Sequence, residues 1–211
     1  MRPLSIKCEN VSFAYSAYTV FQNLNFEITQ GQKIALVAPN GAGKTTLLHL
    51  LSKMLVPDQG KVSVYKDQKI IEKRKYFSDL GIALPHPYML MDYTIEENLI
   101  LHQQFHQNPE FKHAAELAKL FSMTHIMNRK CGNLSFGELR KATLIKALMN
   151  HAPYVMLDEP TNGLDDRAKD LLLEYLKTLD GILIIATHDR SWAVDLATDI
   201  WTIHDRGVHD F

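Results

Sequence analysis

Residues 38–46 have the composition and order of a loop that binds phosphate groups. They read Ala38, Pro39, Asn40, Gly41, Ala42, Gly43, Lys44, Thr45 and Thr46. The order matches the phosphate-loop pattern, except that Ala38 stands where a first glycine is expected. Small residues such as Gly41 and Gly43 let backbone N–H groups close around an anion. Lys44 would neutralise the β- and γ-phosphates of a nucleotide, and the Thr45 hydroxyl would bind Mg²⁺. The alternative is a turn that is merely rich in glycine.

A pair of carboxylates could complete the chemistry of such a loop. Asp158 and Glu159 follow the apolar run 154–157. Asp158 suits Mg²⁺ bound through water, and Glu159 could polarise an attacking water as a general base. An Asp-Glu pair is otherwise a solvated strand end, so the interpretation depends on the phosphate loop lying nearby.

The elements around these residues predict an α/β fold. Apolar residues mostly alternate over 4–28, as in an antiparallel sheet with one buried face. The run 33–38 lacks alternation and indicates a strand buried on both faces, followed by the loop and by a helix from Lys44. Similar runs at 154–157 and 182–186 flank a helical stretch over 166–179, which favours parallel strands crossed by helices.

Further along the chain, two regions differ from this core. Residues 87–132 have a helical pattern with few strand signals, and Thr94 with Glu97 predicts a capping box at a helix start. The segments 200–204 and 208 onward predict a closing hairpin. We therefore expect an inserted helical subdomain within an otherwise mixed sheet and helix core.

The composition excludes several classes of protein. With 211 residues, 46% hydrophobic and 22% charged, the chain is neither disordered nor fibrous. The 23 basic and 24 acidic residues give a net charge of −1, so no global basic field draws the chain to nucleic acid. Two cysteines and no secretory leader suit a reducing cytoplasm. The apolar runs are shorter than the roughly 20 residues that span a bilayer, so a membrane role would need a partner.

The segment 134–138 lies just upstream of the carboxylate strand and adds a more specific motif. Its residues are Leu134, Ser135, Phe136, Gly137 and Glu138, and they resemble the signature motif of ATP-binding cassette (ABC) ATPases. The other family motifs follow in order over essentially the whole chain, as Tyr15, the phosphate loop, His86, Asp158 with Glu159, Asp165 and His188.

The resemblance implies a P-loop NTPase with a mostly parallel RecA-like core, an N-terminal antiparallel β-subdomain and an inserted helical subdomain. On this basis residues 1–211 form a single ABC ATPase domain. The nucleotide-binding core with the β-subdomain would comprise residues 1–86 and 133–211. The helical subdomain would comprise residues 87–132.

The resemblance also assigns expected roles to single residues. Tyr15 would stack on adenine, although Tyr18 lies close by and Tyr15 is otherwise a strand-end tyrosine. ATP would lie between two head-to-tail copies, with Ser135 and Gly137 against the γ-phosphate held by the opposite subunit. Asp165 would couple the two sites across the dimer.

His188 follows the buried run 182–186 and matches the switch histidine of the family. There an imidazole would contact the γ-phosphate and orient water. A lone histidine is otherwise structural, and the remaining histidines show no comparable context.

Besides Ala38, three positions depart from the family pattern. His86 stands where glutamine is expected, and a protonated histidine is a poorer Mg²⁺ ligand, so we expect slow turnover that depends on pH near neutrality. Phe136 replaces a glycine and Glu138 a glutamine, which bears on the affinity of the closed dimer rather than on its geometry. Ser135 and Glu138 also predict a capping box.

Function follows from the resemblance. It implies a Mg²⁺-dependent ATPase subunit of an ABC transporter, a homodimer or heterodimer that drives transmembrane permease subunits supplied by another chain. We expect it in the cytoplasm at the inner face of the membrane, without nucleic acid. The chain length favours a compact exporter, ABC-2-type or haem-exporter-like system. It argues against the coiled-coil layout of DNA-repair members and the paired cassettes of translation factors.

Two alternatives remain open. One is a soluble ABC ATPase that acts as a scaffold or assembly partner, as in iron–sulfur biogenesis. The other is a nucleotide-gated binding module that hydrolyses little ATP, suggested by Ala38, His86, Phe136 and Glu138. Intact Lys44, Asp158, Glu159 and His188 argue against the second alternative.

Overall fold

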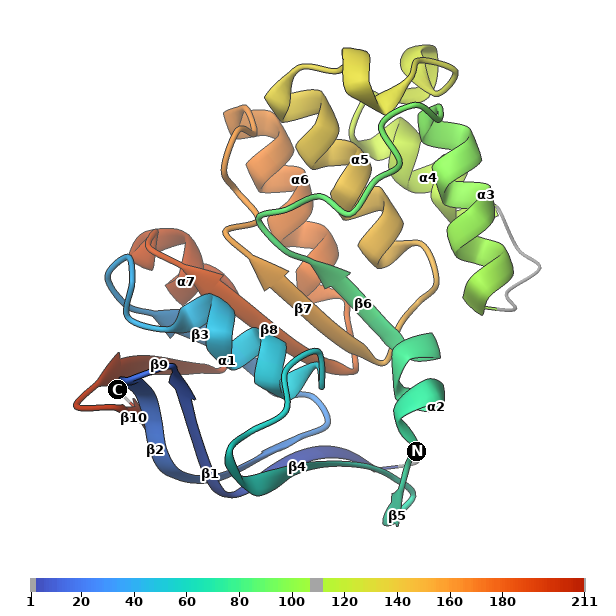
Figure 1. Ribbon diagram of the computed structural model, residues 1–211. Coiled ribbons are helices and arrows are strands. Elements are labelled where there is room, and N and C mark those ends of the chain that lie inside the picture. The colour runs from blue at the N-terminus through green and yellow to red at the C-terminus, as the bar shows by residue number, and fades with distance from the viewer. Residues whose placement is uncertain (1–2, 107–111, 211) are drawn as a thin grey trace.

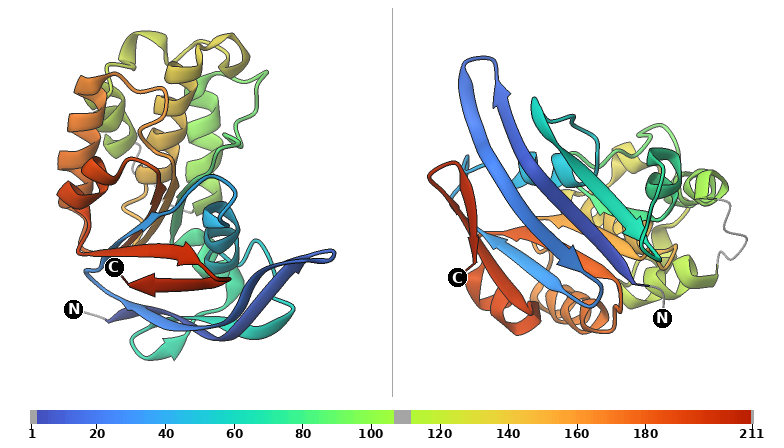
Figure 2. Two further views of the ribbon diagram at one scale, coloured as in Figure 1. Left: turned by 90° about the vertical axis from the view of Figure 1, so that its left-hand side faces the viewer. Right: turned by 90° about the horizontal axis from the view of Figure 1, so that it is seen from below.

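The computed structural model describes residues 3–106 and 112–210. Two sheets and a layer of helices stack on one another, and helix α1 lies between the two sheets (Figures 1 and 2). This arrangement confirms the α/β fold with a parallel-rich sheet and a separate antiparallel sheet.

The antiparallel sheet contains the N-terminal strands in the order β2-β1-β4-β5. Its bounds are β1 Leu4–Tyr15, β2 Tyr18–Thr29, β4 Gln59–Lys66 and β5 Lys69–Ile70. Strands β1 and β2 form a long hairpin in which Tyr15 lies opposite Tyr18. The antiparallel sheet predicted from the alternating pattern over 4–28 is present, whereas the pairing of β1 with β4 was not expected.

The second sheet has the strand order β10-β9-β3-β8-β7-β6. Its bounds are β3 Lys33–Val37, β6 Leu80–Ala83, β7 Tyr154–Asp158, β8 Ile182–Thr187, β9 Asp199–His204 and β10 Gly207–Asp210. The pairs that join β9, β3, β8, β7 and β6 are parallel, and β9 with β10 forms the expected closing hairpin. The carboxyl ends of β3, β7 and β8 therefore meet at one edge of the sheet.

Helices cover both faces of this second sheet. Helix α1 lies on the face toward the antiparallel sheet, while α5, α6 and the inserted helices lie on the other (Figure 1). The bounds are α1 Lys44–Leu51, α2 Lys73–Ser78, α3 Ile95–His106, α4 Lys112–Leu120, α5 Phe136–Leu148, α6 Asp166–Lys177 and α7 Arg190–Leu196, with short 3-10 turns at Thr124–Ile126 and Cys131–Asn133.

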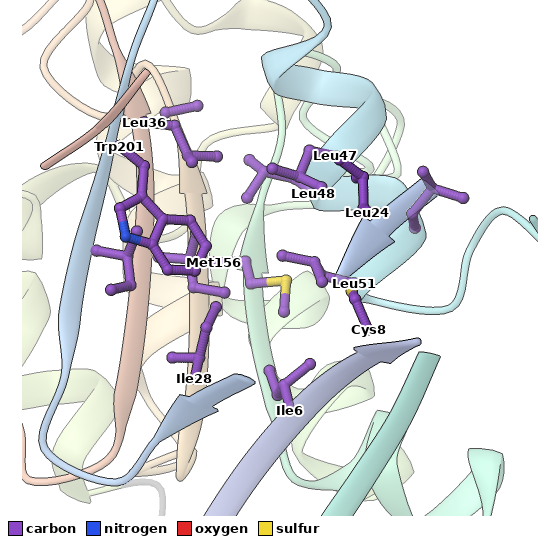
Figure 3. Packing of buried hydrophobic residues seen from close by; sticks show 14 of the residues in the cluster. Ile6, Cys8, Leu24, Ile28, Leu36, Leu47, Leu48, Leu51, Met156 and Trp201 are labelled. Carbon is purple, nitrogen blue, oxygen red and sulfur yellow. The ribbon is translucent and has the colours of Figure 1, made fainter. Parts of the chain in front are cut away.

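The hydrophobic core is divided by the parallel strands into two clusters. Met156 of β7 packs with Leu48 of α1 and Ile6 of β1 between the two sheets (Figure 3). Its neighbours in sequence, Val155 and Leu157, face the helices on the opposite side. Both faces of β7 are buried because a parallel strand is covered by helices on each side. Alternation by two then fixes the side on which each residue lies.

The capping boxes predicted at two helix starts are present. Glu97 N donates to Thr94 Oγ1 at 3.1 Å, and Thr94 N donates to Glu97 Oε2 at 2.7 Å, immediately before α3. Helices α3, α4 and α5 share one buried cluster with β7 and β8. The inserted helices thus pack through α5 onto the parallel sheet.

Acid should weaken this packing through His102 of α3. The rings of His102 and His106 lie 4.1 Å apart, and burial, together with the charges of His106 and Lys146, lowers the pKa of His102 to about 3. The unfolded chain takes up that proton below about pH 6.5, so unfolding becomes more favourable by about 1.4 kcal/mol per pH unit below that value. Stability is therefore fully present above about pH 6.5 and is lost as the pH falls.

The measurement is thermal unfolding of the wild type and of His102→Gln at about pH 7.5 and about pH 5.5. We expect the wild type to lose more stability than His102→Gln when the pH is lowered from the higher to the lower of these two values. His125→Gln, at an exposed turn, is the matched control. Equal losses in the wild type and in His102→Gln would contradict the assignment.

Candidate active site

The loop between β3 and α1 has, at two positions, a backbone conformation that favours glycine. Gly41 has φ +81° and Gly43 has φ +106°, in the left-handed region that other residues rarely occupy. A Cβ on Gly43 would also lie 2.9 Å from Val20 Cγ1 and 3.0 Å from Phe21 Cζ. The β1–β2 hairpin therefore packs directly against the loop, and α1 begins at the next residue with its N-terminus toward the loop.

Lys44 is buried at the first position of α1, where its ammonium group turns back over the loop. Its Nζ donates hydrogen bonds to the carbonyl oxygens of Ala38 at 2.6 Å and Pro39 at 3.3 Å. The same Nζ lies 3.8 Å from Glu159 Oε1. The structure thus joins the loop to the carboxylate pair through a cation.

Asp158 ends β7 in contact with the start of α1. The Thr45 hydroxyl donates a 2.5 Å hydrogen bond to Asp158 Oδ2. Burial raises the pKa of Asp158, and the hydrogen bond from Thr45 opposes that rise. A carboxylate and a hydroxyl, both oxygen donors, therefore meet at one point where a cation would offset the cost of the buried charge.

Glu159 leaves the strand in an unusual conformation. Its φ is +46°, a value uncommon for residues other than glycine. The Glu159 N–H donates to the Ala186 carbonyl of β8 at 2.7 Å, and Oε2 lies 2.8 Å from His188 Nδ1. Because an ionised carboxylate only accepts, His188 Nδ1 must carry the proton of this bond, leaving Nε2 of a neutral ring as an acceptor.

A cleft of about 310 Å³ connects these groups. Its walls are Asn40, Gly41, Gly43, Lys44, Thr45, Thr46, Pro85, Asp158 and Glu159. The cleft is lined by residues of the phosphate loop, including its lysine, and by two carboxylates, which is an arrangement that could hold a phosphate chain beside a general base. The structure therefore brings together the loop and the carboxylates that lie far apart in sequence.

The signature segment begins α5. Glu138 N donates to Ser135 Oγ at 3.3 Å, and Ser135 N donates to Glu138 Oε2 at 2.7 Å, which confirms the predicted capping box. Arg129 Nη1 donates to Glu138 Oε1 at 3.1 Å. Glu138 is thereby engaged within its own chain, and hydrogen bonds from Ser135 lower its pKa.

Phe136 and the loop before α6 form a second contact. The Phe136 side chain is 69% exposed, yet its ring leaves no room for a Cβ on Gly163, which would lie 2.6 Å away. Lys141 Nζ donates to Asp165 Oδ2 at 2.8 Å, and Asp165 Oδ1 caps α6 by accepting from Ala168 N. The start of α5 and the loop 161–165 are therefore joined within one subunit.

Tyr15 and His86 are exposed predicted site residues that do not line the 310 Å³ cleft. Tyr15, at the tip of the β1–β2 hairpin, is 50% exposed and packs edge-on against Phe13 at 4.9 Å. His86 is exposed, with its ring 5.3 Å from that of Tyr88. Its neighbours Pro85 and Pro87 both line cavities next to Glu159.

Sequence reasoning missed Arg140. It is 7% exposed, and it donates through Nη1 to the Leu84 carbonyl at 3.1 Å and through Nη2 to the Asp158 carbonyl. Burial lowers its pKa, which the charges of Asp158 and Glu159 oppose. The available signal was its spacing, because Arg140 lies four residues before Leu144 and seven before Ala147 on the buried face of α5.

The described ranges 3–106 and 112–210 lack the features of two other kinds of site. Neither range contains a helix of the length and hydropathy needed to cross a membrane. They also hold no group of three or more histidine, cysteine, aspartate or glutamate side chains that could bind a metal ion by themselves.

Comparison with known proteins adds an independent finding. The family model described as "ABC transporter" matches residues 21–162. A ribosome protection protein, VmlR of Bacillus subtilis, is 34% identical over 202 residues, which are 96% of this chain and 32% of that protein. A putative ABC transporter ATP-binding protein of Archaeoglobus fulgidus is 31% identical over 200 residues, which are 91% of this chain and 83% of that protein.

Among solved structures, a dimeric bacterial ABC transporter cassette superposes with a TM-score of 0.83 at 23% identity, over 97% of this chain and 96% of the other. The fold is therefore that of such a cassette. The chain spans about a third of the length of the first relative and most of the second.

Proposed function

Because the chain belongs to the ABC transporter family, we propose that it is the ATP-binding and ATP-hydrolysing subunit of an ABC transporter. Cassettes of this family bind ATP or ADP. One observation carries the proposal for this chain. Lys44 and Thr45 of the phosphate loop contact Glu159 and Asp158 across a single cleft, with His188 on the far side of Glu159.

The residues of the cleft suit a Mg²⁺-bound nucleotide. The Thr45 hydroxyl and the Asp158 carboxylate would hold the ion, since oxygen donors of this kind are those that Mg²⁺ prefers. When bound, the ion neutralises charge on the phosphate oxygens. Lys44 and the N–H groups of the loop bind the phosphates, and Glu159 takes a proton from the attacking water. His188 holds the Glu159 carboxylate through Nδ1.

The working unit is a head-to-tail dimer. Ser135 and Gly137 of one subunit contact the γ-phosphate held by the other, and Asp165 lies at the interface. Tyr15 stacks on the adenine. ATP contacts both subunits only when they are closed, so binding favours closure and loss of the γ-phosphate favours opening. The dimeric state of the similar bacterial cassette supports this arrangement.

The membrane-spanning part of the transporter belongs to another chain. Residues 87–132 form the helical subdomain that contacts this permease, and the subunit is held at the inner face of the membrane through it. The partner provides the route for cargo, while this chain provides the ATPase cycle.

Two measurements test the proposal. Purified protein should release phosphate from ATP only when Mg²⁺ is present. A tagged Glu159→Gln protein, with ATP, should recover a multi-span membrane protein from detergent-solubilised cells. Absence of phosphate release, or recovery of soluble proteins alone, would contradict the transporter assignment.

A second candidate follows from the similarity to the ribosome protection protein, which is the more identical of the two relatives above. In this reading the ATP-driven closure acts on the ribosome instead of a permease. The same affinity experiment separates the two functions, because ribosomal proteins would replace the membrane protein in the recovered fraction. The iron–sulfur assembly alternative receives no support from the relatives.

The rate of turnover tests the role of His86. With His86 at the glutamine position near the attacking water, His86→Gln restores the amide of that position and should raise kcat by about 10-fold. The measurement is phosphate release at saturating Mg²⁺ and ATP. His125→Gln serves as the control at an exposed site. An unchanged rate in His86→Gln would remove His86 from the mechanism.

A further inference from the structure

Arg140 is a buried cation that contacts two strand ends at once. Its Nη1 donates to the carbonyl of Leu84, directly after β6, and its Nη2 donates to the carbonyl of Asp158, the last residue of β7. The two strands are parallel neighbours, with Ala83 opposite Leu157. A single side chain of α5 therefore holds the backbone on either side of the catalytic cleft.

The burial of Arg140 is unfavourable for the stability of the fold. Its Nε has no hydrogen-bond partner within the described part of the chain and is inaccessible to solvent. A buried N–H without a partner is unfavourable, and a buried guanidinium adds a desolvation cost. An apolar side chain of similar size would avoid both costs, so the arginine calls for a role other than packing.

Because a cavity lies beside Arg140, its hydrogen bonds are an important connection between α5 and the two strand ends. A cavity of about 210 Å³, with mainly apolar walls, lies between the start of α5, the segment after β6 and the end of β7. Its lining includes Phe136, Arg140, Pro85 and Glu159. Farther along α5, close packing resumes, because a Cβ on Gly81 would lie 2.1 Å from the Ala147 carbonyl.

The same helix carries the signature residues one turn earlier. Gly137 and Arg140 are three residues apart, so about 4.5 Å of a stiff helix separates them along its axis. Gly137 also packs against the Gly163 carbonyl, which a Cβ would approach to 2.5 Å, and Lys141 binds Asp165. Any shift of the start of α5 therefore moves Arg140 and the loop 161–165 together.

We propose that Arg140 is a positioning residue that couples the signature end of α5 to the Asp158–Glu159 strand end of its own subunit. The inference rests on the proposed ATPase dimer. Nucleotide bound by the opposite subunit displaces α5, and Arg140 transmits that displacement to the Asp158 backbone and so to Glu159. Occupancy of one site thereby sets the geometry of the general base in the other.

The test is ATP hydrolysis by the purified full chain as a function of ATP concentration, for the wild type, Arg140→Met and Arg140→Lys. We expect a wild-type Hill coefficient above about 1.3. Arg140→Met should lower kcat by about 10-fold or more and bring the Hill coefficient to about 1, while ATP affinity by equilibrium binding changes by less than about 2-fold. Arg140→Lys keeps a donor and should give intermediate values.

Arg74→Met, at an exposed position on α2, is the matched control and should behave as the wild type. Thermal unfolding and ATP affinity establish that each variant is folded. A folded Arg140→Met with wild-type kcat and Hill coefficient would overturn the inference, as would a wild-type Hill coefficient of about 1. A loss of kcat with unchanged cooperativity would assign Arg140 a local role only. A wild type that releases no phosphate would instead overturn the proposed function itself.

Discussion

Glu159→Gln should lower kcat for ATP hydrolysis by about 10³-fold while ATP still binds. The amide keeps the size and one oxygen of the carboxylate but cannot accept the proton of the attacking water. The neighbouring groups remain in place, since Lys44 still holds the loop carbonyls and His188 retains an oxygen acceptor. ATP should therefore bind and hold the dimer closed.

Phosphate release measures the loss of hydrolysis, and size-exclusion chromatography with Mg²⁺ and ATP measures the closed dimer. We expect negligible turnover and a stable dimer from the variant. Glu174→Gln, on the exposed face of α6 where Glu174 pairs with Lys177, is the control and should match the wild type in both assays. Hydrolysis at the wild-type rate by Glu159→Gln would show that another group is the base.

Lys44→Ala should reduce the affinity for ATP by about 100-fold, equivalent to about 2.7 kcal/mol. The ammonium group is the buried cation at the phosphate loop, 3.8 Å from Glu159, so its loss leaves phosphate charge without a neutralising partner. It also removes the donor that holds the carbonyls of Ala38 and Pro39. At subsaturating ATP, the rate of hydrolysis should fall because less ATP is bound.

Equilibrium titration with a fluorescent ATP analogue measures this effect directly. Lys69→Ala, at an exposed position on β5, provides the control with the same change of charge and size. Thermal unfolding without nucleotide separates a loss of affinity from a loss of fold. An affinity within about 3-fold of the wild type would exclude Lys44 from phosphate binding.

Local patterns in the sequence predicted the parts of the site that depend on neighbouring residues. The glycines of the loop, the capping box of Ser135 with Glu138, and the doubly buried strand before Asp158 all follow from short-range rules. The alternation along β7 even fixes a direction, because Asp158 shares the side of Met156, toward α1 and Thr45. Family resemblance then supplied expected roles for these positions.

Long-range contacts were beyond such rules. The hydrogen bond of Thr45 to Asp158 joins residues 113 positions apart, and the pairing of His188 with Glu159 spans 29. Strands β4 and β6 were also missed, because burial along β4 does not alternate and the four residues of β6 are too few to show a period. His86, which stands where the family pattern has glutamine, is exposed beside Tyr88.

By itself the sequence determined which residues could bind phosphate, ion and water, because side-chain chemistry and local spacing are written in the chain. Only the tertiary structure decided which of them meet. Parallel pairing of β3, β8 and β7 brings three separate loops to one sheet edge, and packing of α5 on that sheet buries Arg140 against two of its strand ends. Contacts of this kind arise from the closure of long segments of chain, which no local pattern encodes.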